Sequence, residues 1–179
     1  MGLLAAIMLA VYLANPFGTA SLDPRARLLG VALYKIPSRS MEPTLQQGDF
    51  ILANAARYAF PDPQVGDLVV FRFPPQRSIA YVKRIAGIPG DRVRIDGGRL
   101  YVNERPVTEP YLAQQALRQP DSLRMAERTV PAGQYFMLGD NRDNSNDSRY
   151  WGYVPRADLV GRVFAVWYAE DTRRIGSVR

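Results

Sequence analysis

The chain has 179 residues, of which 47% are hydrophobic and 22% are charged, a balance that suits one globular domain with a short appendage. It contains no cysteine, which excludes disulfides, thiol nucleophiles and cysteine-ligated metals, and no histidine, which excludes a Ser-His-Asp triad and the usual zinc sites. A hydrolase built from this sequence must therefore take its base from a carboxylate, a lysine or a terminal amine. The formal net charge is +6, but the basic residues are dispersed, which argues against a nucleic-acid-binding footprint.

Residues 1–22 are interpreted as an N-terminal hydrophobic membrane anchor, because they contain no charged side chain. A spanning helix needs about 20 such residues, and Asn15-Pro16 interrupts this run. A removable signal peptide and a buried helix are the alternatives, although no basic residue precedes the apolar run as a signal peptide would require. Arg25 and Arg27 follow the run, and the positive-inside rule alone would place that side in the cytoplasm. Residues 23–35 are interpreted as a linker and membrane-proximal segment.

Beyond the anchor, the pattern predicts short strands joined by turns. The candidate strands are rich in Val, Ile, Phe and Tyr and are bounded by Gly, Pro and Asp. They are Leu28–Ile36, Phe50–Ala53, Leu68–Phe73, Ile79–Ile85, Val93–Ile95, Leu100–Val102, Tyr135–Leu138 and Val160–Trp167. For Leu28–Ile36, a segment that approaches the membrane surface is the alternative. Gly97-Gly98 predicts a hairpin, and the polar stretch Tyr111–Arg128 predicts a loop with room for one helical turn. Many short strands with regular turns indicate an all-β barrel or sandwich.

Two serines lie two residues apart in the segment Ile36–Leu45. Ser38 and Ser40 stand between Pro37 and Pro43, which stiffen the backbone on both sides. A nucleophile needs a fixed and exposed hydroxyl, and rigid flanks help to supply one. A serine- and proline-rich surface loop is the alternative interpretation of this stretch taken alone.

A candidate base follows in the predicted strand Ile79–Ile85. Strand alternation places Lys83 on one face with Tyr81 and Ile85, so the lysine lies between two largely apolar side chains. A lysine can act as a base only when it is neutral, and burial disfavours the ammonium form. The alternative is a surface lysine whose stem lies along the sheet.

The segment Gly139–Arg149 contains three Asp and three Asn, which first suggests calcium. No Glu closes the loop as in an EF-hand, and Arg142 and Arg149 would oppose a cation. We therefore expect no metal site and no cofactor here. The favoured interpretation is a tight turn cross-linked by Arg and Asp pairs.

Four segments, in order along the chain, resemble the successive motifs of type I signal peptidases (leader peptidases), which are Ser/Lys-dyad serine peptidases. They are Ser40-Met41 with Pro43-Thr44-Leu45 and Gly48-Asp49, then Gly66–Phe71, then Lys83-Arg84 with Gly87–Asp91, and finally Gly139–Gly152. Each segment alone is a weak signal, but four in this order are specific. The resemblance implies a mainly β fold, with an antiparallel β-barrel or sandwich catalytic domain of the signal peptidase type over residues 36–179. It also implies a small β insertion at about 92–138 and an N-terminal anchor helix.

By this resemblance, Ser40 attacks the scissile carbonyl and Lys83 takes its proton, which forms an acyl-enzyme that water hydrolyses. The Ser40 backbone N–H and the Ser38 hydroxyl would form the oxyanion hole. Ser145 matches a serine that hydrogen-bonds and orients the lysine. No cofactor is implied.

The resemblance also implies a supporting salt bridge between Asp147 and Arg149, and pockets for a substrate that binds as an added strand. Small substrate residues are implied just before the cut and two positions earlier. The first pocket would be lined by Pro37, Met41, Leu45, Tyr81 and Val82. The second pocket would be lined by Tyr34, Ile36, Ile51 and Val70.

The implied function is a membrane-bound serine endopeptidase that removes N-terminal signal peptides from exported preproteins. The implied location is the cell (plasma or inner) membrane, by a single pass with the catalytic domain on the extracytoplasmic side, and the partners are signal peptides and membrane lipid. Arg39 stands where many members carry Gly, which keeps open a specialised maturation peptidase for pilin or conjugation proteins. Only 39 mostly apolar residues precede Ser40, which argues against a self-cleaving repressor with a DNA-binding domain. A non-catalytic binding protein on the same scaffold and an OB-type nucleic-acid-binding barrel are the remaining alternatives.

Overall fold

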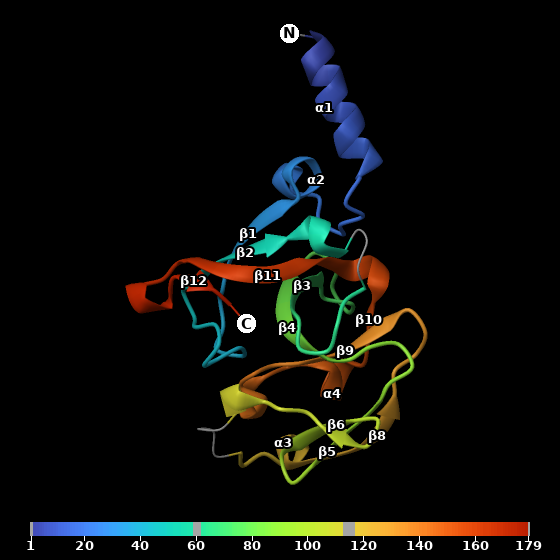
Figure 1. Ribbon diagram of the computed structural model, residues 1–179, viewed down its shortest axis with the longest axis vertical. Coiled ribbons are helices and arrows are strands. Elements are labelled where there is room, and N and C mark those ends of the chain that lie inside the picture. Colours follow the sequence, from blue (N-terminus) through green and yellow to red (C-terminus); the bar gives the residue numbers. More distant parts are fainter. Residues whose placement is uncertain (1, 59–61, 113–116, 179) are drawn as a thin grey trace.

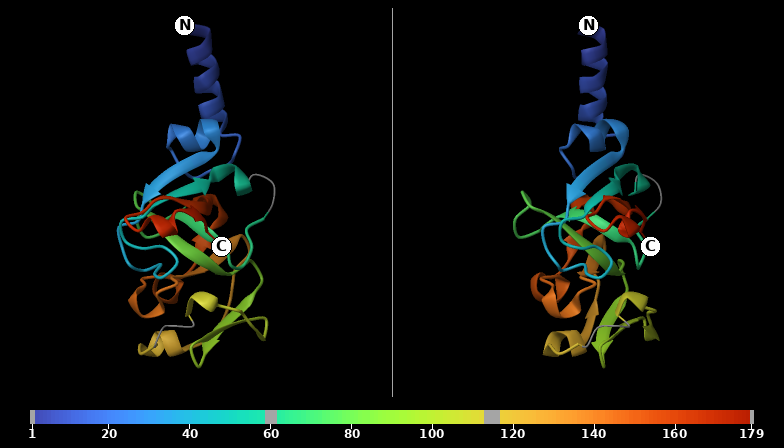
Figure 2. Two further views of the ribbon diagram at one scale, coloured as in Figure 1. Left: turned by 60° about the vertical axis from the view of Figure 1, so that its left-hand side comes forward. Right: turned by 90° about the vertical axis from the view of Figure 1, so that its left-hand side faces the viewer.

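The computed structural model describes residues 2–58, 62–112 and 117–178. Antiparallel β-structure dominates, in one large and one small sheet, and an N-terminal helix projects from the body (Figure 1). Figure 2 shows from two further sides that this helix and the small sheet lie at opposite ends of the molecule. The expectation of a mainly antiparallel β fold is confirmed.

The N-terminal region forms two helices. Helix α1, Gly2–Ala14, is apolar and has no buried residue, and helix α2 spans Pro24–Leu29. Along the described part of the chain, no helix combines the length and apolarity needed to cross a bilayer. Part of the expected linker, residues 23–35, is helical because α2 lies within it. Asp23 explains the start of α2, because its carboxylate accepts a hydrogen bond from the Arg25 N–H at 2.8 Å, with a proline at the first helical position.

The large sheet has the strand order β1-β2-β11-β3-β4-β9-β10, and β12 pairs with β11. Strand β11, near the C-terminus, lies between β2 and β3 and so joins the two ends of the sequence in one sheet (Figure 1). The strands are β1 Val31–Lys35, β2 Phe50–Asn54, β3 Leu68–Arg72, β4 Ala80–Gly87, β9 Gln134–Leu138, β10 Val154–Pro155, β11 Leu159–Tyr168 and β12 Gly176–Ser177.

The small sheet has the order β7-β6-β5-β8. Its strands are β5 Arg92–Asp96, β6 Arg99–Val102, β7 Arg105–Pro106 and β8 Arg124–Thr129. The hairpin at Gly97-Gly98 is confirmed, because Asp96 pairs with Arg99 and both glycines have the positive φ of such a turn. The eight strands predicted from the sequence thus all appear in the two sheets, with ends that differ by up to a few residues.

One strand occurs where the sequence predicted a loop. Strand β8 begins within the polar stretch 111–128 and ends just beyond it, and among its side chains only Met125 is buried, so the strand carries no clear alternation. This segment is a strand because it pairs with β5, and not because its own sequence has an apolar pattern. The same stretch overlaps the turn η2 Pro110–Leu112 and contains the short helix α3 Pro120–Leu123, while residues 113–116 lie outside the described residues.

Four clusters of buried hydrophobic side chains pack the described part of the chain together. One cluster, which includes Met41, Leu45 and Val70, packs beneath the segment that carries Ser38 and Ser40. Full burial of one such side chain contributes roughly 1.5–3 kcal/mol, so this layer holds the segment firmly. The remaining turns are η1 Ala55–Tyr58, η3 Arg142–Asn144, α4 Ser148–Trp151, η4 Arg156–Asp158 and η5 Thr172–Arg174.

Candidate active site

Ser40 lies in the connection between β1 and β2, in a turn held from both ends. The Ile36 N–H donates to the Asp49 carbonyl at 2.8 Å, which closes the base of the connection. Just beyond Ser40, the side chains of Met41 and Leu45 are 1% and 0% exposed and anchor the turn in the core. Ser40 itself stays partly exposed. The fixed and accessible hydroxyl expected from the flanking prolines is therefore present.

Lys83 comes from β4, in the middle of the large sheet, where it is paired with Val69 of β3. Its side chain is only 4% exposed, and its Nζ lies 2.6 Å from Ser40 Oγ and 3.2 Å from the Val82 carbonyl oxygen. The Nζ also lies 5.3 Å from the centre of the Tyr81 ring. The structure thus places the two residues of the expected dyad in direct contact, although they lie 43 residues apart in the sequence.

The environment of Lys83 favours its neutral form. Burial lowers the pKa of the Lys83 ammonium from an ordinary 10.5 to about 8, because the charged form loses its hydration, while the charges of Asp147 and Asp140 act in the opposite direction. A lysine with this pKa is neutral in a substantial fraction of molecules at mildly alkaline pH. It can then accept a proton from the hydroxyl that it contacts.

Ser38 is exposed beside the dyad, and its Oγ lies 3.3 Å from Ser40 Oγ. The Ser40 N–H donates no hydrogen bond to any part of the chain that the structure describes. Two donors thus lie beside the nucleophile, the Ser40 N–H and the Ser38 hydroxyl, and the hydroxyl contacts Ser40 Oγ itself. Arg39, between the two serines, does not have a positive φ, so this backbone does not require a glycine. The Arg39 side chain is 67% exposed, and its Nε lies 3.8 Å from Glu42 Oε1.

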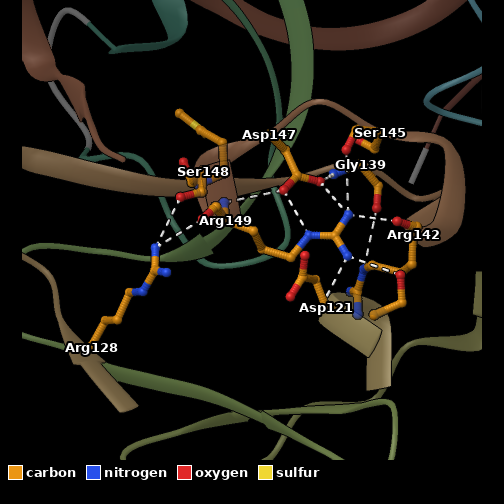
Figure 3. A network of polar contacts seen from close by, with 10 residues as sticks. Asp121, Arg128, Gly139, Arg142, Ser145, Asp147, Ser148 and Arg149 are labelled. Atoms are coloured by element: carbon orange, nitrogen blue, oxygen red, sulfur yellow. Dashed lines mark hydrogen bonds and ion pairs between the residues drawn. The ribbon is translucent and has the colours of Figure 1, made fainter. Parts of the chain in front are cut away.

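The loop Gly139–Arg149 lies against the backbone of the segment that carries Ser40. Figure 3 shows Arg149 at the centre of the polar network of this loop. Arg149 Nε donates to the Asp147 carboxylate at 2.8 Å, and both side chains are at most 2% exposed. Asp147 also accepts the Gly139 N–H at 3.0 Å, and Arg149 donates to the Arg142 carbonyl at 2.5 Å (Figure 3). The prediction of a turn cross-linked by Arg and Asp is therefore confirmed.

A second ion pair ties this loop to β4. Arg84 donates two hydrogen bonds to Asp140, at 2.9 and 2.7 Å, and both side chains are at most 9% exposed. The neighbouring Arg142 pairs with Glu109, which belongs to the connection between β7 and η2. Since Arg84 follows Lys83 directly, the pair fixes the strand position from which the lysine projects.

Ser145 is buried behind the dyad, but its hydroxyl has no hydrogen-bond partner among the described residues. The hydrogen bond from Ser145 to Lys83 that the resemblance implies is not formed in this structure, and the orienting role of Ser145 stays a prediction. Its position is nonetheless close to the nucleophile. A Cβ atom on Gly139 would approach both Ser145 Oγ and the Ser40 carbonyl oxygen.

A cleft of about 360 Å³ opens at the dyad. Apart from Leu45 and Ile51, the expected pocket residues line it: Tyr34, Ile36, Pro37, Met41, Val70, Tyr81 and Val82. Leu45 and Ile51 are both 0% exposed and lie in the core cluster behind this wall, so substrate contact is not expected from them. The sequence interpretation missed five further lining residues, of which Asn144 and Asn146 come from the distant loop: Lys35, Ile79, Ala80, Asn144 and Asn146.

One strand edge beside the cleft has no β partner. Strand β4 pairs with β3 from Ala80 to Arg84, but its pairing with β9 begins only at Arg84. The segment Ala80–Lys83 is therefore paired on one side only, within the part of the chain that the structure describes. Such an edge can accept an additional extended strand.

Comparison with known proteins agrees with this geometry. The sequence model of a family described as "Signal peptidase, peptidase S26" matches residues 3–168. Signal peptidase I of Pseudomonas aeruginosa is 42% identical in an alignment of 180 positions, gaps included, that covers 75% of this chain and 63% of that protein. Probable signal peptidase I-2 of Synechocystis is 44% identical over 136 residues, covering 72% of this chain and 59% of that protein.

A solved structure supports the same relationship. The crystal structure of a signal peptidase I from Enterococcus faecalis matches with a TM-score of 0.51 and 33% identity, over 57% of this chain and 97% of that one. This chain spans 63% of the length of the first two curated relatives that it matches. The chain belongs to the signal peptidase family, peptidase S26.

Proposed function

We propose that this chain is a serine endopeptidase that removes signal peptides from exported preproteins, with Ser40 as nucleophile and Lys83 as general base. The single observation that carries the proposal is the 2.6 Å contact between Lys83 Nζ and Ser40 Oγ in an open cleft. A lysine can serve as the base here because burial lowers its pKa to about 8. The four motifs and the family relationship point to the same chemistry.

The proposed reaction has two halves. Neutral Lys83 accepts the hydroxyl proton as Ser40 Oγ attacks the scissile carbonyl, and the Ser40 N–H and Ser38 hydroxyl stabilise the developing oxyanion. Lys83 then transfers the proton to the leaving amine, and the peptide bond breaks to leave an ester on Ser40. A water that loses a proton to Lys83 attacks this ester, and Lys83 returns the proton to Ser40 Oγ as the acyl group leaves, which restores the free enzyme.

The substrate binds, in this proposal, as an extended strand along the unpaired edge of β4 from Ala80 to Lys83. The apolar wall of the cleft accepts its side chains. Met41 and Val70 are 1% and 0% exposed and packed on the core, so this wall cannot easily retreat to admit a large side chain. We therefore infer a preference for small residues just before the cut and two positions earlier.

Helix α1 supports the proposal of a membrane-bound enzyme. Its apolar side chains are largely exposed, for example 77% at Leu3 and 67% at Leu13, and the helix projects away from both sheets (Figures 1 and 2). In this proposal, residues 1–22 form part of a single-pass anchor in the cell membrane, residues 23–35 connect it, and residues 36–179 form the extracytoplasmic catalytic domain with an insertion at about 92–138. Membrane lipid is then a second partner.

Cleavage of a model preprotein whose leader ends in Ala-x-Ala tests the proposal. Wild type, Ser40→Ala and Lys83→Met are compared in detergent, with Ser177→Ala as a control serine on β12. We expect wild type and the control to cut after the second Ala, and the two dyad variants to be inactive but folded. Full activity in either dyad variant would overturn the mechanism. If wild type does not cut the model preprotein but processes a pilin-type precursor, the substrate is a pilin-type protein instead of an exported preprotein.

A further inference from the structure

Asn141, in the loop behind the dyad, makes two hydrogen bonds to the backbone around the nucleophile. Its side-chain Nδ2 donates to the Arg39 carbonyl at 3.1 Å, and its backbone N–H donates to the Ser40 carbonyl at 3.1 Å. We propose that Asn141 is a positioning residue that orients the Arg39–Ser40 peptide so that its N–H faces the reacting carbonyl. This inference rests on the proposed function, because that N–H is the proposed backbone donor of the oxyanion hole.

The geometry of the peptide unit makes this contact important. The Arg39 carbonyl and the Ser40 N–H belong to one planar trans unit and point in opposite directions, so fixing the oxygen also fixes the N–H. The oxygen accepts two hydrogen bonds, from Asn141 Nδ2 and from the Glu42 N–H, the latter also at 3.1 Å. The Ser40 N–H itself is left without an acceptor in the described part of the chain. Hydrogen bonds accepted by the carbonyl also polarise the unit and strengthen its N–H as a donor.

Asn141 is itself held in place by the buried network of its loop. The Gly139 N–H is bound by Asp147, which pairs with Arg149, and the Asn141 carbonyl accepts the Asn144 N–H at 3.0 Å. The Asn141 side chain is only partly buried and belongs to none of the hydrophobic clusters. Its contribution is therefore the pair of contacts to the nucleophile segment, and an amide is required because a carboxylate cannot donate to a carbonyl.

Two substitutions test the inference in the full chain. Asn141→Asp keeps the shape but replaces the donor with a charge that repels the Arg39 carbonyl, and Asn141→Ala removes the donor without a charge. Asn103→Ala is the control, because Asn103 also bonds a backbone group, the Arg92 N–H, but in the small sheet. Loss of a whole oxyanion donor costs about 100- to 1,000-fold. Since the Glu42 N–H still holds the carbonyl, we expect kcat to fall about 10- to 100-fold with little change in KM.

A transition-state readout separates positioning from folding. A peptide aldehyde ending in Ala-x-alaninal forms a tetrahedral adduct with Ser40, so its affinity should fall by the same factor as kcat/KM. The affinity of an uncleaved peptide for the Ser40→Ala protein should not change when Asn141→Ala is added. The inference is overturned if both Asn141 variants keep wild-type kcat. It is also overturned if aldehyde and uncleaved peptide weaken equally, or if Asn103→Ala reproduces the loss. If wild type itself fails to cut the preprotein yet binds the aldehyde, the proposed substrate fails while the aldehyde series still tests Asn141.

Discussion

Gly139 and Ser145 are packed so closely that a Cβ atom on Gly139 would lie 2.1 Å from Ser145 Oγ. The same atom would lie 2.6 Å from the Ser40 carbonyl oxygen, so the glycine brings the supporting loop against the backbone of the nucleophile. No side chain fits between these groups. Position 139 thus requires a glycine because there is no room for a Cβ atom, and not because the backbone has a positive φ.

Gly139→Ala should therefore impair both stability and catalysis. We expect a loss of about 1–3 kcal/mol in the free energy of unfolding, as for other overpacked sites. We expect a fall in kcat of about 100-fold or more, because Ser40 must shift and misplacement of about 1 Å can cost that much. Urea unfolding and preprotein cleavage measure the two effects. The double variant Gly139→Ala/Ser145→Ala should not recover activity, because the clash with the Ser40 backbone remains, and wild-type kcat in Gly139→Ala would contradict this account.

The pH profile of cleavage should report the titration of Lys83. Only the neutral amine can accept the serine proton, so activity should rise as pH increases through about 8 and level off above it, well below the ordinary lysine value of 10.5. Values of kcat/KM, obtained from initial rates between pH 6 and 10.5, give the apparent pKa of the base in the free enzyme. A profile that rises only near 10.5 would contradict the burial argument.

Lys83→Met should stabilise the folded chain at neutral pH even as it abolishes activity. The folded pKa of about 8 lies below the ordinary 10.5, so the unfolded chain binds more protons between these values, and the buried amine destabilises the fold most below pH 8. The difference corresponds to roughly 3 kcal/mol at pH 7. Urea titrations at pH 7 and pH 10 should show the advantage of Lys83→Met shrinking as pH rises. Ser40→Ala, which keeps the lysine, should retain the pH dependence of wild type. Equal stability of wild type and Lys83→Met at pH 7 would contradict a destabilising effect of the buried amine.

The Asp147–Arg149 pair should be important for stability because it is buried. Asp147→Asn leaves the Arg149 guanidinium uncompensated in a site that is 2% exposed, and removal of one partner of such a pair typically costs about 3–5 kcal/mol. Thermal and urea unfolding measure this loss. Asp171→Asn is the matched control, since it disrupts an exposed pair with Arg173 and should leave stability unchanged. Equal behaviour of the two variants would show that the buried pair is not a structural support.

Arg174 should affect the turn that follows the nucleophile. It donates to the Pro43 and Thr44 carbonyls at 3.3 and 3.2 Å and to the Asp49 carboxylate at 2.7 Å. Arg174→Ala should loosen the turn that carries Met41 in the cleft wall, and so raise KM about 3- to 10-fold with a smaller effect on kcat, since each such bond contributes about 1–3 kcal/mol. Steady-state kinetics on the model preprotein check this. Arg173→Ala, which removes only an exposed neighbour, should behave as wild type.

Local sequence patterns predicted most of the strands, the candidate base and the family of this protein. Val- and Ile-rich segments between Gly, Pro and Asp predicted the main strands, because a strand buried on one or both faces requires apolar side chains wherever it occurs. Alternation placed Lys83 between two largely apolar side chains but left a surface lysine as the alternative, and its 4% exposure shows that the lysine is buried. The absence of histidine leaves a lysine among the few possible bases, and the four motifs in order indicate the family without any knowledge of distances.

Tertiary structure decided what depends on contacts between distant segments. Strand β8 has no alternation of its own and exists because β5 pairs with it. The contact between Lys83 and Ser40 and the hydrogen bonds of Asn141 to the nucleophile segment arise where the connection between β1 and β2 meets β4 and the loop after β9. The burial of Leu45 and Ile51 behind the cleft depends on the same packing. A residue pattern records the preferences of its own neighbourhood. Hydrogen bonds between segments that are distant in the sequence form only when the folded sheet brings those segments together.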